Sequence, residues 1–282
     1  MSGLLFGTGG TTPQAKSPSS IDGIIRNAEV GLGCMELEFV QRVSMGEAGA
    51  RLVAETAAKE GVQLSAHAPY YINLNAREPE KISASQGRLL QTARIAALCG
   101  ARSVVFHPAF YLGDPPEKAY KMVKQYLGEV LEQLKKEGNQ VQIRPELMGK
   151  PSEFGTLEEI LELSAEMDRV APCIDFAHCH ARHGEVNSYQ EFASVLSKIE
   201  ERLGRDALDD MHIHLSGIAY GKKGELKHLR LEESDLKYVE LLKALRDYKV
   251  KGLVICESPR DFMEENALLL QSTYNNLLKE AR

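Results

Sequence analysis

The sequence alternates short apolar runs with longer amphipathic segments along its length, and this alternation constrains the fold more than any other feature. The apolar runs have four to six residues with few polar side chains, as is typical of parallel strands that are buried on both faces. Eight such runs are present, at residues 4–7, 34–39, 62–67, 103–107, 141–146, 171–175, 211–215 and 252–257. The pattern therefore predicts eight parallel strands.

Between the predicted strands, apolar residues recur at helical spacing. Helices are predicted at residues 82–98, 119–134, 157–167, 189–203, 236–245 and 263–278, and helix-ending glycines include Gly61, Gly100, Gly138 and Gly204. A strand and a helix together take about 35 residues, so eight units match an α/β fold of the (β/α)8 TIM barrel type, as a single domain over residues 1–282. An open doubly wound sheet is the alternative. It is disfavoured because the sequence has neither a GxGxxG fingerprint after the first strand nor a P-loop.

Charge and cysteine content limit the partners and the compartment. Lys and Arg number 34 against 40 Asp and Glu, a net charge of −6, so a nucleic acid would need a local basic patch. No segment approaches the roughly 20 apolar residues of a membrane helix, and the apolar run at residues 4–6 is too short for a signal peptide. Five cysteines without a CxxC pair suit a reduced compartment. We expect a cytoplasmic protein without membrane contact.

Ionisable residues stand at the ends of six consecutive predicted strands, where the active site of such a barrel lies. Each one alone could be an ordinary structural residue, such as a helix cap. Together at one barrel mouth they would cost several kcal/mol unless they were paired or bound to metal. Imidazole with carboxylate is a ligand set for Zn²⁺ and also for Mn²⁺. The residues are His67, His107, Glu146, Asp175, His212 (with His214 on the same strand) and Glu257.

The number of candidate ligands indicates more than one metal ion. One ion takes three or four protein ligands, and His178 and His228, in the loops after the sixth and seventh strands, add to the set. Glu146 stands in the middle of the strand order and is the natural bridging carboxylate. Two ions roughly 3.5–4 Å apart can activate a water and stabilise the attacking and leaving oxygens of a phosphodiester.

The order and spacing of these motifs resemble the endonuclease IV family of apurinic/apyrimidinic (AP) endonucleases, which are trinuclear-zinc TIM barrels. The resembling segments are SAHAPYYINL at 65–74, VVFHPA at 104–109, PELMGKPSEFG at 145–155, CIDFAH at 173–178, MHIHLSG at 211–217 and ICESP at 255–259. The resemblance implies three zinc sites. The first would have His67, His107 and Glu146, the second Glu146, Asp175, His212 and Glu257, and the third His178 and His228.

The same resemblance implies a function and a partner. The expected reaction is zinc-dependent hydrolysis of double-stranded DNA 5′ to an abasic site during base excision repair, with Glu146 and Glu257 as catalytic carboxylates and two or three Zn²⁺ ions, or Mn²⁺ in their place. The abasic nucleotide would be flipped out of the helix, and a monomer is expected. Tyr70 and Tyr71 would wedge into the duplex. A local basic patch would bind phosphates, with Arg182, Lys222, Lys223 and Arg260 as candidates.

Three positions depart from the family pattern. Leu226 stands where the family has an aspartate two residues before the last histidine, with Glu225 one residue away as a substitute. After the histidine assigned to strand seven, His214, Leu215 and Ser216 stand near the family's Leu-Asn-Asp. The second strand carries Glu36 and Glu38, more like sugar isomerases and epimerases. These departures concern the third zinc and the DNA contacts.

Two other functions fit parts of the pattern. A single-metal sugar or sugar-acid isomerase or epimerase would use only the set on strands five to eight, with two carboxylates moving protons as acid and base. It has no need of His67, His107 or His228, and these histidines favour the nuclease. A barrel with only a binding or regulatory role is disfavoured, because an idle cluster of ionised groups would be costly to keep.

Overall fold

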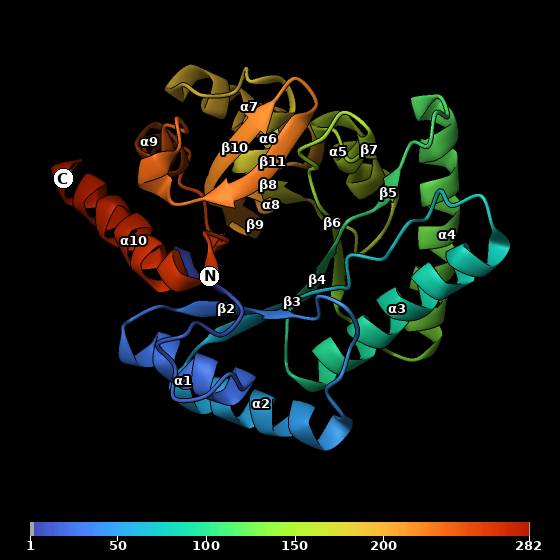
Figure 1. The fold of residues 1–282 in the computed structure, drawn as a ribbon, viewed down its shortest axis with the longest axis horizontal. Coiled ribbons are helices and arrows are strands. Elements are labelled where there is room, and N and C mark those ends of the chain that lie inside the picture. The colour runs from blue at the N-terminus through green and yellow to red at the C-terminus, as the bar shows by residue number, and fades with distance from the viewer. Residues whose placement is uncertain (1–2, 282) are drawn as a thin grey trace.

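The computed structural model describes residues 3–281 and shows a parallel eight-stranded sheet curled into a barrel, with helices around its outside (Figure 1). The strands follow one another in the order β6-β4-β3-β2-β1-β12-β9-β8. Their bounds are β1 Leu4–Gly9, β2 Cys34–Glu38, β3 Gln63–His67, β4 Ser103–Phe106, β6 Gln142–Pro145, β8 Cys173–Asp175, β9 Met211–Leu215 and β12 Gly252–Cys256. Each overlaps one predicted strand, so the predicted single-domain (β/α)8 barrel is confirmed.

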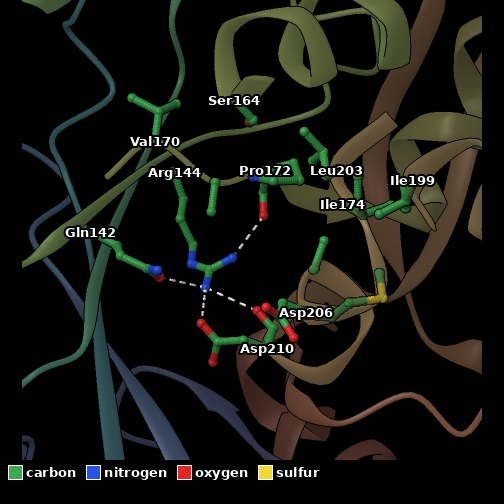
Figure 2. A pocket seen from close by; sticks show the side chains of 13 residues that line it. Gln142, Arg144, Ser164, Val170, Pro172, Ile174, Ile199, Leu203, Asp206 and Asp210 are labelled. Carbon is green, nitrogen blue, oxygen red and sulfur yellow. Dashed lines mark hydrogen bonds and ion pairs between the residues drawn. The ribbon is translucent and has the colours of Figure 1, made fainter. Parts of the chain in front are cut away.

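Among residues 3–281, the barrel closes between β6 and β8 with only two isolated bridges, Ile143 to Val170 and Glu146 to Cys173. The buried guanidinium of Arg144 spans the gap between β6 and the segments before β8 and β9. It donates to the carbonyl of Pro172 at 3.0 Å and to a carboxylate oxygen of Asp210 at 2.9 Å. Arg144 lines a cavity of about 230 Å³ at the end of the barrel where the strands begin (Figure 2). This end is stabilised by side chains in place of a continuous strand ladder.

Eight longer helices form the outer layer. They are α1 Ser20–Glu29, α2 Glu47–Glu60, α3 Pro79–Leu98, α4 Pro116–Lys136, α5 Leu157–Glu166, α7 Tyr189–Leu203, α9 Tyr238–Asp247 and α10 Met263–Glu280. Local signals start and stop them: Thr156 and Glu159 form a capping box at α5, and Gly61 ends α2 in the left-handed conformation. The helices α1 and α2 were not among the predicted ranges. Within residues 3–281, no helix is both long and apolar enough to cross a membrane.

Several short elements cover the end of the barrel at which the strands have their carboxyl ends. A hairpin of β10 (Gly217–Gly221) and β11 (Gly224–Leu229) follows β9, and β5 (Ala109–Phe110) pairs with β7 (Glu153–Phe154). The short helix α6, Phe176–His183, begins directly after β8, whereas α8, Arg205–Asp209, precedes β9 at the opposite end of the barrel. The segment after β9 was treated as a loop in the sequence, whereas it is a strand pair. These elements carry several of the candidate ligands.

Candidate metal centre

Imidazoles and carboxylates gather at the carboxyl end of the barrel strands. His67 and Asp175 are the last residues of β3 and β8, Glu146 and Glu257 directly follow β6 and β12, and His214 lies in β9. All but Glu257, which is slightly exposed, are almost completely buried. Buried groups of this kind need partners of opposite charge or a cation.

The first group consists of His67, His107 and Glu146. The Nε2 atoms of both histidines lie 3.1 Å from Oε2 of Glu146. The Nδ1 atom of His67 lies 2.8 Å from the carbonyl of Ala68, which can only accept, so Nδ1 carries the proton and Nε2 is left to bind. Burial lowers the pKa of His67, but the carboxylates of Glu146 and Glu38 outweigh it and raise that pKa to about 10. The position therefore attracts positive charge.

The second group consists of Glu146, Asp175, His214 and Glu257. The Nδ1 atom of His214 lies 3.4 Å from Oε1 of Glu146 and 3.3 Å from Oε1 of Glu257. Burial, together with the nearby carboxylates of Glu146 and Asp175, raises the pKa of Glu257 to about 8 despite the opposing effect of His214. Four donors from four strands thus converge on one point.

The structure places His214 in this group instead of the predicted His212. Residues two apart on a strand face the same side, so both histidines point into the barrel but at different depths. The strand register aligns His214 with Asp175 and His212 with Cys173, one layer further from the mouth. The Nε2 atom of His212 accordingly lies against Glu36, at 2.9 Å from Oε2. The assignment of His212 beside Asp175 and Glu257 is corrected by this register.

The third group consists of Asp175, His178 and His228. The two histidines face each other through their Nε2 atoms at 3.4 Å. Their Nδ1 atoms contact main-chain carbonyls, His178 that of Leu147 at 3.1 Å and His228 that of Glu257 at 2.9 Å. Because carbonyls only accept, each Nδ1 carries a proton, and two nitrogen lone pairs are directed at the same space.

Glu225, one residue before the departing Leu226, supplies a carboxylate at the third group. Its Oε2 atom lies 3.5 Å from Nε2 of His178 and 3.3 Å from Nζ of Lys150. The pairing of β10 with β11 passes from Ala219–Lys227 directly to Tyr220–Glu225, so Leu226 is the extra residue of a β-bulge. The bulge lets Glu225 and His228, three residues apart, face the same side, while the Leu226 side chain is 68% exposed.

Several buried polar atoms around these groups have no hydrogen-bond partner among the described residues. They include Oδ2 of Asp175, Nδ1 of His214 and Oε1 of Glu38. Native proteins rarely leave such atoms unpaired. Nitrogen and carboxylate oxygen donors at three adjoining points fit borderline divalent cations such as Zn²⁺ or Mn²⁺. The residues present therefore fit metal ions. The sequence-based ligands lie together in these three groups except for His212, which belongs to a separate candidate group with Cys173 and His214.

The residues predicted to contact DNA have mixed environments. Tyr70 and Tyr71 are exposed at the rim. The ring of Tyr70 stacks on that of His107, with 5.1 Å between the ring centroids. Lys222 and Lys223 form the exposed turn of the β10–β11 hairpin, and Arg260 is exposed after β12.

Arg182 is a different case, because it is buried in α6. Its guanidinium donates to the carbonyls of Met148, Lys150 and Glu153, each at 2.9 Å. These bonds use it to hold the loop after β6, so the structure does not bring Arg182 together with the exposed residues predicted to contact DNA.

The sequence matches the family described as xylose isomerase-like TIM barrel over residues 26–273. The chain belongs to this family. An uncharacterized protein of Methanocaldococcus jannaschii is 44% identical over 275 residues, which is 97% of this chain and 98% of the relative. A probable endonuclease 4 of Mycoplasma pneumoniae is 25% identical over 201 residues, covering 69% of this chain and 68% of the relative.

Two solved structures of differently named proteins share this barrel fold. Endonuclease IV from Thermus thermophilus superposes with a TM-score of 0.75 at 20% identity, covering 98% of this chain and 99% of that one. A D-tagatose 3-epimerase-like protein gives 0.73 at 16% identity, covering 93% and 98%. At these identities the likeness establishes the fold alone.

Proposed function

We propose that the chain is a metal-dependent phosphodiester hydrolase of the endonuclease IV type, which cleaves double-stranded DNA 5′ to abasic sites. The observation that carries this proposal is the presence of three adjoining ligand groups that share Glu146 and Asp175. Three histidines, His67, His107 and His228, extend the set beyond what a single-metal isomerase requires. The likeness to probable endonuclease 4 proteins supports the same conclusion.

The proposed ions are two or three Zn²⁺, with Mn²⁺ as the alternative. His67, His107 and Glu146 would hold the first, and Glu146, Asp175, His214 and Glu257 the second. The third would be held by His178 and His228, with Glu225 in place of the family's aspartate. When bound, such ions supply Lewis acidity that activates a water and stabilises the oxygens at the reacting phosphorus.

Two carboxylates have separate roles in this proposal: one sets the spacing of the ligand groups and the other accepts a proton. Glu146 is nearly fully buried and presents Oε2 to the first group and Oε1 to His214 and His178, so its fork fixes the spacing between groups. Glu257 is the most exposed of the four residues of the second group and can be reached from the mouth. Its carboxylate is therefore the one placed to accept a proton from the attacking water.

The rim provides the proposed DNA contacts. The ring of Tyr70 packs against His67 of the first group, and the neighbouring Tyr71 is 63% exposed. An aromatic wedge there would support an extruded nucleotide. Lys222, Lys223 and Arg260 would bind backbone phosphates locally, since the whole chain is acidic.

The decisive experiment combines metal analysis with a nicking assay. Protein purified without chelator should contain two or three zinc ions and should nick a duplex carrying a single abasic site. His107→Ala should lower nicking at least about 100-fold, because it removes a ligand. His183→Ala, an exposed histidine of α6 outside the ligand groups, should leave nicking unchanged. One metal ion per chain with no nicking would contradict the proposal.

A second candidate function has one observation in its favour. Glu38 of β2 approaches Glu257 and is less buried than Glu36, so the mouth holds carboxylates that suit sugar hydroxyls better than phosphate. Glu146, Asp175, His214 and Glu257 alone would hold one metal ion for an isomerase or epimerase. A panel of ketoses and sugar acids, tested on the same preparation, would reveal that activity.

A further inference from the structure

The barrel is interrupted at one place, the gap between β6 and β8, which we call the seam. These two strands stand at opposite ends of the strand order, so the continuous sheet between them runs through the other six strands. The apolar core is divided in a similar way, since one cluster of buried side chains contains Ile143 and another contains Ile174. The barrel therefore has two halves, which a strand ladder joins between β1 and β2 and side chains join at the seam.

A proline in β6 explains why the strand ladder is incomplete at the seam. The amide of Ile143 donates to the carbonyl of Arg169 at 2.9 Å, and the amide of Leu147 donates to that of Cys173 at 3.0 Å. Successive amides of a strand point to opposite neighbours, so an amide at position 145 would face β8 as well. This residue is Pro145, which has no N–H. The sequence thus removes one ladder bond from the middle of the seam.

The side chain of Arg144 ties the two edges of the seam together (Figure 2). Arg144 is 4% exposed, and its Nη1 atom donates to the carbonyl of Pro172, directly before β8, at 3.0 Å. Its Nη2 atom donates to the main-chain carbonyl and to Oδ2 of Asp210, directly before β9, at 3.0 and 2.9 Å. The guanidinium is a rigid planar fork, so it can make these bonds together only at a fixed spacing between the strands.

The seam also divides the three ligand groups. The first group lies on one side, because its residues belong to β3 or follow β4 and β6. The third group lies on the other side, because its residues belong to β8, α6 and β11. The second group spans the seam, since Glu146 follows β6 and its three partners belong to or follow β8, β9 and β12. The width of the seam therefore determines whether the four donors of the second group can meet at one ion.

We infer that Arg144 is a positioning residue that sets the width of the seam and thereby the place of Glu146 in the second group. This inference rests on the metal centre of the proposed function. Glu146 follows Arg144 by two residues, about 7 Å along a strand, so a displacement of β6 at the guanidinium also displaces the carboxylate. A substitution at Arg144 should therefore affect the second ion and spare the ions that are held within one half.

The first test is a zinc titration. Metal-free wild-type protein and Arg144→Met are titrated with zinc against a chromogenic chelator. Loss of a residue that orients ligands typically weakens metal binding about 10–100-fold, and we expect this loss at one ion, with the others unchanged. The affected ion should be the one that His214→Gln removes, so adding Arg144→Met to His214→Gln should cause no further loss. The Asp210 carboxylate remains paired in the variant, because Nη2 of Arg102 lies 2.9 Å from its Oδ1.

Hydrogen exchange provides a readout that does not involve metal. The amide of Leu147 donates to Cys173 across the seam, whereas the amide of Ala68 donates to the carbonyl of Val105 within one half, at 2.8 Å. In metal-free Arg144→Met, the Leu147 amide should lose its protection and the Ala68 amide should keep its wild-type exchange rate. A residue that only stabilised the fold as a whole would speed exchange at both amides.

Arg205→Met is the matched control. Arg205 belongs to α8, at the same end of the barrel, and donates to the carbonyls of Tyr248 and Lys249, each at 2.7 Å. These partners precede β12, so the bonds stay within one half of the barrel, and the variant should keep the wild-type zinc affinities and Leu147 exchange. If Arg144→Met does not fold, Arg144→Lys keeps a charge beside Asp210 without the fork, and the same selective loss is expected.

The outcomes separate this inference from the proposed function. Unchanged zinc affinities in a folded Arg144 variant, equal weakening at every ion, or the same selective loss in Arg205→Met overturns the positioning role while the metal centre stands. A wild-type protein that binds neither zinc nor manganese contradicts the metal centre and the positioning role with it. A wild-type protein that binds metal but does not nick abasic DNA contradicts only the nuclease, and the titration of the Arg144 variant remains decisive for positioning.

Discussion

At the scale of single residues, the two histidines of β9 look interchangeable in sequence but lie in different environments. His214 is level with Asp175, whereas His212 is level with Cys173 and contacts Glu36. We predict that His214→Gln removes one ion, weakening its binding by more than about 100-fold, because the amide does not replace the imidazole nitrogen of the second group. His212→Gln should retain the wild-type number of zinc ions. Elemental analysis after gel filtration would measure both.

These two substitutions control for each other, since both replace a buried histidine of the same strand with the same amide. Circular dichroism establishes that both variants fold before their metal contents are compared. If His212→Gln lost an ion and His214→Gln kept it, the register argument would be contradicted.

At the scale of secondary-structure elements, the bulge in β11 decides which residue completes the third group. Because Leu226 is the extra residue and points to solvent, an aspartate placed there would not reach the histidines. We predict that Leu226→Asp leaves metal content and nicking unchanged. Glu225→Gln should weaken binding of the third ion about 10–100-fold, because it removes a carboxylate from that site. Zinc titration of the two variants checks this, and a gain in affinity for Leu226→Asp would show that the bulge is not maintained.

Much of this arrangement could be predicted from sequence because the strands are buried on both faces and read as continuous apolar runs. Because parallel strands end at the same face of a barrel, the residues at the strand ends, among them His67, Glu146 and Asp175, were expected to lie together. Register was not accessible, because the depth of His214 depends on how β9 pairs with β8. The fate of Arg182 was equally hidden, since only the folded loop after β6 brings three carbonyls to its guanidinium.

At the scale of the whole molecule, the distribution of charge limits how DNA can be held. The net charge of −6 repels a polyanion, while the basic groups at the mouth are few and lie on the hairpin turn and after β12. Binding would therefore depend on a small number of phosphate contacts, and each contact makes affinity depend on salt.

Replacing Lys222 and Lys223 together with Gln should weaken binding to an abasic duplex without altering metal content. Each phosphate contact contributes about 0.9 to the slope of log affinity against log salt. The double variant should therefore have a slope shallower by about 2 than the wild type, measured by fluorescence anisotropy across a salt series. Lys135 and Lys136, exposed in the last turn of α4, provide the matched double control and should leave the slope unchanged. An equal change in both double variants would mean that DNA is attracted by overall charge and not by the hairpin.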